Sequence, residues 1–147
     1  MASAGRTPLV HEIMTRDPMV VRADDDLVSV LALFDGRDFN AVPVVDVEGY
    51  LLGVVTKLSL LRMFHTASAA GASDVSRPPD LRVRDVMDTR NVWVETADDL
   101  NALLRQMTRY LVRSVPVVQR SGRRRRLVGM VSRGDLLRGL ARPHTSN

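Results

Sequence analysis

The stretch LVGMVSRGDLLRGL, residues 127–140, decides the fold that we expect of this chain. Its apolar and β-branched start gives way at Ser132 to leucines at helical spacing, which predicts a strand that runs directly into a helix. The stretch LLGVVTKLSLLRMF, residues 51–64, has nearly the same pattern but carries Ser59 where the later stretch carries Asp135. The chain therefore repeats a strand-to-helix junction and keeps its carboxylate in only one copy.

The two junctions belong to a longer internal repeat. Val10 aligns with Val83, and the motif VPVV at residues 42–45 aligns with the same motif at residues 115–118, both at a shift of 73 positions. The second copy then has three extra residues within SGRRRRLVG before the match resumes. So many matches in one register indicate a duplicated unit.

Each copy has the pattern of a small α/β unit. In the first copy, a brief strand at residues 19–21 precedes a helix with an acidic start, DDD, which suits an N-terminal cap and the helix dipole. Two β-branched runs about a glycine, residues 41–55, predict a hairpin, and a second helix follows Thr56. The second copy has its hairpin at residues 115–131 and its last helix from Ser132. We therefore expect an α/β (α+β) fold: two β-α-β-β-α units, related by a pseudo-twofold axis and packed through their sheets into one module.

The boundaries follow from the repeat and from local composition. The residues between the copies are rich in Ala, Ser, Gly and Pro, which is typical of a linker. A single copy of about 55 residues would bury little core, so we expect the copies to pack together. The expected divisions are an N-terminal tail at residues 1–8, a first copy at 9–64, a linker at 65–80, a second copy at 81–141 and a C-terminal tail at 142–147.

Composition excludes several classes of protein. The 147 residues include no cysteine, which removes thiol catalysis, thiolate metal sites and disulfides. His11, His65 and His144 are scattered and no glycine-rich phosphate loop occurs, so we expect neither an enzyme nor a required cofactor. No apolar run approaches the roughly 20 residues that span a bilayer, and the N-terminus lacks the apolar core of a secretory signal. We therefore expect a cytoplasmic protein without membrane insertion.

The order of elements resembles a known family. A strand, a helix, a VPVV hairpin and a helix start of the form G-h-h-S/T occur twice between Val10 and Leu140, and the second copy completes the form G-h-h-S/T-x-x-D. This order resembles a pair of CBS domains, often called a Bateman module. The resemblance implies a regulatory module that binds an adenosine-containing ligand, AMP, ADP, ATP or S-adenosylmethionine, in clefts between the paired units. It also implies a homodimer of modules and a conformational signal to an effector protein that the sequence does not identify.

The motif SRGD at residues 132–135 has two interpretations. In the first it is a capping box, in which Ser132 and Asp135 satisfy unpaired amides at the helix start. In the second, the Asp135 carboxylate accepts hydrogen bonds from both ribose hydroxyls, and the helix start favours a nearby phosphate. The resemblance favours the second interpretation. Ser59 offers no carboxylate at the matching position, so we predict one competent ligand cleft and one weakened cleft.

The resemblance assigns the other ligand contacts by position. Met130 and Ser132 would line the ribose side of the cleft, and Arg113 and Arg133 would meet phosphate, because guanidinium groups suit phosphate oxygens. Main-chain groups would read the adenine edge while apolar side chains flank the ring, at Pro18, Met19, Phe39, Asn40 and Ala41. Met19 and Phe39 also fit an ordinary hydrophobic core. The weakened cleft would pair Ser59 with Val92, Trp93, Arg113 and Ser114, where Trp93 either stacks on a base or belongs to the core.

Other functions remain open. The missing acid at Ser59 also fits a ligand-free dimerisation or docking module, and the chain also fits the regulatory part of a transporter or enzyme. The four arginines at residues 123–126 fit either a solvated loop or a contact with polyanions. Because the sequence shows no aromatic interleaving and no recognition-helix pattern, we do not expect a nucleic-acid partner.

Overall fold

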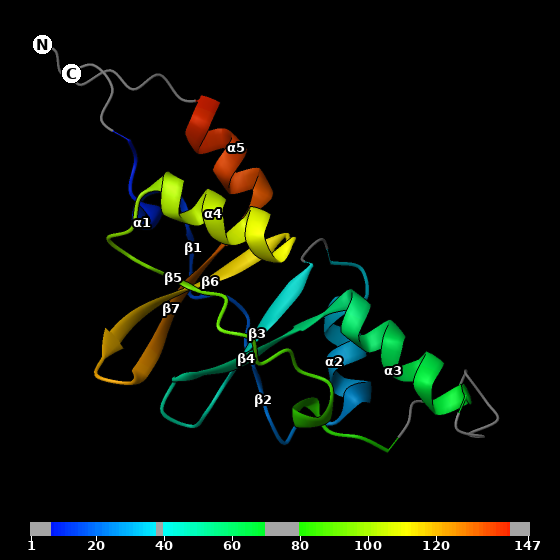
Figure 1. Ribbon diagram of the computed structural model, residues 1–147. Coiled ribbons are helices and arrows are strands. Elements are labelled where there is room, and N and C mark those ends of the chain that lie inside the picture. Colours follow the sequence, from blue (N-terminus) through cyan, green and yellow to red (C-terminus); the bar gives the residue numbers. More distant parts are fainter. Residues whose placement is uncertain (1–6, 38–39, 70–79, 142–147) are drawn as a thin grey trace, which may run out of the picture. The chain divides into compact units, whose positions relative to one another are not determined.

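The computed structural model describes residues 7–37, 40–69 and 80–141, and for residues 64–69 it describes the backbone only. Its elements in chain order are α1 (Val10–Ile13), β1 (Thr15–Arg16), β2 (Val21–Arg22), α2 (Leu27–Phe34), β3 (Ala41–Val45), β4 (Leu51–Thr56), α3 (Lys57–Ala69), the 3-10 helix η1 (Val83–Asp85), β5 (Val94–Glu95), α4 (Leu100–Tyr110), β6 (Ser114–Ser121), β7 (Arg124–Ser132) and α5 (Arg133–Ala141) (Figure 1). Within these residues, no helix has the length and apolarity needed to cross a membrane.

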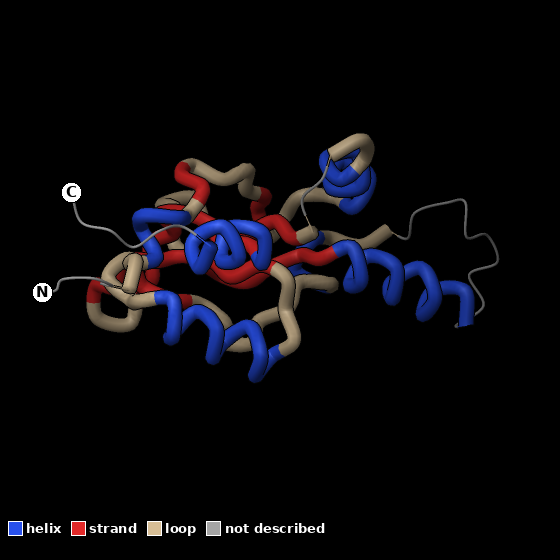
Figure 2. Tube along the Cα trace, turned by 90° about the horizontal axis from the view of Figure 1, so that it is seen from above, coloured by secondary structure: helices blue, strands red, loops and turns tan. Residues whose placement is uncertain are grey.

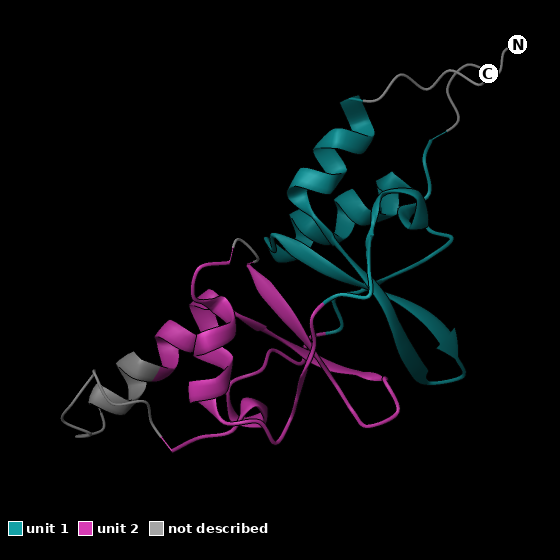
Figure 3. Ribbon diagram, turned by 180° about the vertical axis from the view of Figure 1, so that it is seen from behind, with its two compact units in different colours: residues 1–18, 91–147 teal, residues 19–90 magenta. Residues whose placement is uncertain are grey.

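The chain forms two compact units, each with its own sheet (Figure 3). Unit 1 comprises Met1–Pro18 and Asn91–Asn147, and its sheet has the strand order β1-β7-β6-β5. Unit 2 comprises Met19–Arg90, and its sheet has the order β2-β3-β4. In both sheets a parallel pair adjoins an antiparallel hairpin, so the mixed α/β fold expected from the repeat is confirmed.

The predicted elements form for the reasons that their sequences indicate. Asp26 caps α2 by accepting a hydrogen bond from the Ser29 backbone N–H at 2.8 Å, and Asp99 caps α4 by accepting one from Ala102 at 3.0 Å. The bond from Ser29 also lowers the pKa of the Asp26 carboxyl, since it favours the charged form. The residues of each VPVV motif are buried, and each motif lies in one strand of a hairpin. The acidic residues therefore cap helices and the β-branched runs form hairpin strands, as the repeat predicts.

Each unit buries its own hydrophobic core between its sheet and its helices. Figure 2 shows the helices in blue and the strands in red. In unit 1, α4 packs on β5 and β6, and α5 packs on β7 and on α4. Fully buried side chains in this unit include Val10, Leu103 and Val117. Their counterparts in unit 2 include Val83, Val30 and Val44. The matching positions show that the duplication extends to the packing of each core.

The compact units divide the chain differently from the sequence repeat. The leading segment of the first copy belongs to unit 1, where Thr15 in β1 pairs with Met130 in β7. The leading segment of the second copy belongs to unit 2, where the backbones of Asp88 and Val54 exchange hydrogen bonds of 2.8 and 3.0 Å. Counted from residues 9 and 81, each copy therefore gives its first ten residues to the compact unit that the other copy completes.

This exchange explains a glycine in each hairpin. A Cβ atom on Gly129 would lie 2.6 Å from the Met14 sulfur and 2.9 Å from the Thr15 carbonyl oxygen. A Cβ atom on Gly53 would lie 2.7 Å from the Asp88 carbonyl oxygen. Both leading segments thus cross a hairpin where only glycine leaves room for their backbone.

The helix α3 is longer than the sequence indicated. It ends at Ala69 and so includes the first five residues of the segment expected to be a linker. This segment begins HTASA, without glycine or proline, and alanine is the residue that most favours a helix. Residues 70–79, the rest of the expected linker up to Asp80, lie outside the described residues.

We expect Gly129→Ala to lower the free energy of unfolding by about 1–3 kcal/mol, because the added methyl group must displace the backbone of Thr15. Gly53→Ala should behave alike. Gly134→Ala is the control: it lies within α5, its Cβ would come no closer than 3.4 Å to a neighbour, and alanine favours a helix. Urea unfolding measures all three variants. Wild-type stability of Gly129→Ala would contradict the backbone crossing.

Candidate functional site

The start of α5 is a capping box. Asp135 Oδ2 accepts a hydrogen bond from the Ser132 backbone N–H at 2.9 Å, and Ser132 Oγ accepts one from the Asp135 backbone N–H at 3.1 Å. The two residues therefore satisfy each other's amides, as the first interpretation of SRGD predicts. The strand β7 ends at Ser132 and α5 begins at the next residue, so the carboxylate is held at the junction itself.

The capping bond leaves part of the Asp135 carboxylate available. Its side chain is 11% exposed, and its Oδ1 oxygen forms an ion pair with Arg138, whose side chain is 71% exposed. A carboxylate has about four lone-pair sites, and the two observed partners occupy only some of them. An exposed arginine one turn along the helix is also a weakly held partner that can be exchanged. The geometry thus allows a cap and a ligand contact at the same carboxylate.

In unit 2, Ser59 keeps the cap without the charge. Its Oγ accepts a hydrogen bond from the Thr56 backbone N–H at 2.9 Å and donates one to the Thr56 carbonyl at 2.8 Å. The Ser59 backbone N–H donates to Thr56 Oγ1 at 3.0 Å, which completes the reciprocal arrangement. The two helix starts are therefore equally capped. What differs between them is one negative charge and one acceptor oxygen.

Two arginines lie at the same helix start in unit 1. The Arg133 backbone N–H donates to the Arg113 carbonyl at 2.9 Å, and Arg133 Nε donates to the Val112 carbonyl at 3.3 Å. Both arginines are exposed. Unit 2 has a matching backbone bond of 3.3 Å from Lys57 to Asn40, so the arrangement belongs to the duplicated fold. At the matching positions unit 2 has an exposed lysine, Lys57, and Asn40, so the pair of guanidinium groups at this helix start occurs in unit 1.

The structure brings five of the predicted site residues together at the α5 junction of unit 1. Met130, the fifth of them, lies half-buried in β7 two residues before Ser132. These residues are Arg113, Met130, Ser132, Arg133 and Asp135.

The remaining predicted residues come from separate parts of the chain. Pro18 ends the leading segment in unit 1, whereas Met19 begins unit 2. Met19 is 42% exposed, so its alternative assignment to the hydrophobic core is wrong. Asn40 and Ala41 stand at the start of β3 in unit 2. Phe39 lies outside the described residues.

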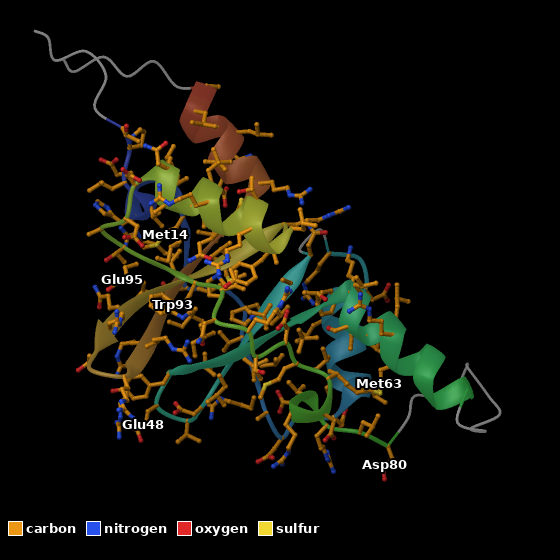
Figure 4. The ribbon with its side chains drawn as sticks, viewed as in Figure 1. Met14, Glu48, Met63, Asp80, Trp93 and Glu95 are labelled. Carbon is orange, nitrogen blue, oxygen red and sulfur yellow. The ribbon has the colours of Figure 1, made fainter. Side chains whose placement is uncertain are left out.

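A cluster that the sequence analysis missed surrounds Trp93 in unit 1, labelled in Figure 4. The guanidinium carbons of Arg120 and Arg125 lie 5.5 and 5.7 Å from the centre of the indole ring, within cation–π range. The neighbouring Val92 is 8% exposed and belongs to the unit 1 core. Only the register of β5 along β6 could have revealed the cluster, since Trp93 and Arg120 are far apart in sequence.

No group of three or more histidine, aspartate or glutamate side chains within the described residues is arranged to hold a metal ion. The charged residues at the α5 junction are one carboxylate and three arginines, which is a set suited to hydroxyl and phosphate groups rather than to a cation.

Comparisons with known proteins agree with this fold. A family model described as CBS domain matches residues 10–66 and 83–142. An uncharacterized protein of Methanocaldococcus jannaschii, MJ1426, is 29% identical, over 92% of this chain and 93% of that protein. The crystal structure of CBSX2 in complex with AMP has a TM-score of 0.74 and 25% identity, over 92% of this chain and 97% of that one. The crystal structure of the CBS domain of a CBS domain containing membrane protein from Sphaerobacter thermophilus has a TM-score of 0.68 and 30% identity, over 90% of this chain and 88% of that one.

We expect Ser59→Ala to destabilise the protein by about 0.5–2 kcal/mol, because the Thr56 N–H then loses its acceptor. Ser59→Asp should unfold much like the wild type, since an aspartate at this position makes the cap seen at Asp135. Urea unfolding compares the two variants. Equal destabilisation of both would show that Ser59 does not act as the counterpart of Asp135.

Proposed function

Because this chain belongs to the CBS domain family, with one copy of the domain in each half of its sequence, we propose that it is a regulatory module that binds an adenosine-containing ligand and signals to a partner protein. The observation that carries the proposal is the Asp135 carboxylate at the α5 junction, with acceptor capacity beyond its capping bond. It occurs in one copy of the repeat only.

The carboxylate suits the vicinal hydroxyls of a ribose. In the proposed complex both hydroxyls donate to Asp135, and the Oδ1 oxygen exchanges or shares its ion pair with Arg138. Hydrogen bonds to a charged group contribute about 1.5–3 kcal/mol each, more than bonds between neutral groups. The capping bond to Ser132 holds the carboxylate in one orientation, which reduces the entropy lost on binding.

Phosphate groups of the ligand would meet Arg113 and Arg133. Both side chains are exposed beside the junction, and guanidinium groups bind phosphate oxygens through paired N–H donors. The adenine ring would lie against the residues that the resemblance assigns to it, Pro18, Met19, Phe39, Asn40 and Ala41, and Met130 would line the ribose side. The AMP complex of CBSX2, which is 25% identical to this chain, supports an adenine nucleotide as the ligand class. ADP, ATP and S-adenosylmethionine are the other candidates.

The proposal includes one ligand per chain. Ser59 reproduces the cap at α3 but supplies no charge to pair with hydroxyl donors, so the cleft that it serves is proposed to be weak. Signalling then follows from differential affinity: a ligand that binds one arrangement of the module more tightly shifts the population toward it. A tenfold difference in ligand affinity between the two arrangements changes the free-energy difference between them by about 1.4 kcal/mol. The module is proposed to act in the cytoplasm.

An apolar surface on unit 1 favours a docking role as well. Leu104 on α4 and Leu137 and Leu140 on α5 are 44%, 66% and 51% exposed. These helices pack on each other, and large exposed apolar groups commonly mark a protein interface. A homodimer of modules would cover this surface. The second candidate function is therefore a ligand-free dimerisation or docking module, which differs from the first in having no response to nucleotides.

We expect isothermal titration calorimetry with AMP, ADP, ATP and S-adenosylmethionine to find binding of at least one compound, at one site per chain. Asp135→Asn should abolish binding, because it removes the charge while keeping a capping oxygen for Ser132. Ser59→Ala is the matched control and should bind like the wild type.

Thermal unfolding separates the two candidates. A ligand at 100 times its dissociation constant stabilises the folded state by about 2.7 kcal/mol, so the melting temperature rises for a sensor and stays constant for a ligand-free module. Absence of any shift at millimolar concentrations of all four compounds would reject the sensor.

A further inference from the structure

The positive charge of the chain is concentrated in one stretch. Between Asp99 and Asp135 there are nine arginines and no lysine, aspartate or glutamate. This stretch carries a formal charge of +9, whereas the net charge of the chain is +4, so all other residues together carry −5. The whole stretch belongs to unit 1. A surface of this kind attracts polyanions over a distance, and its pull falls with ionic strength.

Five of these arginines lie on a projecting β-ribbon. The strand β6 pairs with β5 only at Val117 and Val118, and β7 pairs with β1 only at Gly129 and Met130. Beyond these pairs, residues 119–121 of β6 pair with residues 124–126 of β7. Three residue pairs extend for about 10 Å. The ribbon carries Arg120, Arg123, Arg124, Arg125 and Arg126.

Trp93 forms a platform at the base of this ribbon. Arg120 and Arg125 are direct partners across the two strands, and both guanidinium groups lie within 6 Å of its ring. Arg125 also donates from one terminal nitrogen to Asn91 Oδ1 at 3.0 Å. The Trp93 Nε1 atom is buried and has no hydrogen-bond partner in the described part of the chain. Packing against the ring, rather than the polar group of the indole, therefore holds this cluster together.

The paired arginines call for an explanation. Like charges placed directly opposite each other across two strands are destabilising, and here this repulsion is offset by stacking both groups on one indole ring. Charged side chains do protect an exposed ribbon from pairing with other chains. That protection does not require two guanidinium groups on one aromatic ring.

We propose that the ribbon arginines and Trp93 bind single-stranded nucleic acid without sequence preference. A guanidinium group that stacks on a ring keeps the N–H donors at its edge available for phosphate oxygens. Its outer plane can receive a nucleobase, and sequence-tolerant binding of single strands combines such stacking with a positively charged track. The proposal reverses our expectation from the sequence, in which no aromatic residue lies among the arginines. Parallel pairing of β5 with β6 supplies that residue from a distant part of the chain.

A nucleic acid fits the ribbon better than an acidic protein segment does. The five arginines lie within seven residues, and a phosphodiester backbone carries one negative charge at every nucleotide. Flat bases also match the planar guanidinium groups that Trp93 supports, whereas aspartate and glutamate side chains offer no comparable surface. Competition by an acidic polypeptide in the test would instead indicate an acidic protein partner.

Fluorescence anisotropy with a labelled oligothymidylate of about 20 nucleotides tests the proposal on the full chain. Binding at low salt should weaken with a log–log slope of about −2 to −3.5, as expected for three to five arginine contacts to a single strand. The double variant Arg120→Gln/Arg125→Gln should lower affinity at least tenfold and reduce the slope by about 1.4. Trp93→Ala should also lower affinity, although it leaves the charge unchanged.

The matched control is Arg105→Gln/Arg109→Gln, which removes the same charge from α4 in the same unit and should change affinity less than threefold. Asp135→Asn should bind the oligonucleotide like the wild type, which separates this proposal from the adenosyl-ligand site. The proposal is overturned if no binding occurs at low salt or if the α4 variant loses as much affinity as the ribbon variant. It is also overturned if polyglutamate of equal charge competes as well as the oligonucleotide.

Discussion

The crossing of each leading segment over a glycine is the constraint on which the rest of the structure depends. At Gly129 and at Gly53 a backbone carbonyl of the leading segment occupies the space of a side chain. Because each crossing joins one copy of the repeat to the body of the other, neither copy completes a compact unit from its own residues. In unit 1 the crossing lies on β7, three residues before Ser132, so it also fixes the strand that delivers the helix start of the candidate site.

The two helix starts show how a structural motif and a binding group share one position. Asp135 and Ser59 close the same reciprocal cap, and both therefore stabilise the first turn of a helix. The cap places a side-chain oxygen at the junction whether or not a ligand is bound. Charge at this oxygen is a separate property, which the second copy has and the first lacks. A duplicated fold can thus keep its stability in both copies while its binding chemistry differs between them.

Unit 1 carries the arginine ribbon and the carboxylate of the proposed ligand site, and one strand connects them. The strand β7 begins with ribbon arginines and ends at Ser132, so its nine residues extend from the cationic ribbon to the N-terminus of α5. Unit 2 has a hairpin of the same kind but shorter strands, with five residues in β3 and six in β4. The additional residues in the second copy therefore lengthened a strand and created a surface that has no counterpart in the first.

The sequence by itself determined the repeat, the order of strands and helices, both hairpins, the acidic caps and the difference between Asp135 and Ser59. Each of these is a local property, since side-chain periodicity, turn residues and capping residues act within a few positions. Only the tertiary structure decided which copy receives each leading segment, that Arg138 pairs with Asp135, and that Trp93 lies beneath Arg120 and Arg125. These outcomes depend on the choice of strand partners and on side-chain packing between distant segments. A period along the sequence tells which face of a strand is buried, but not which strand lies beside it.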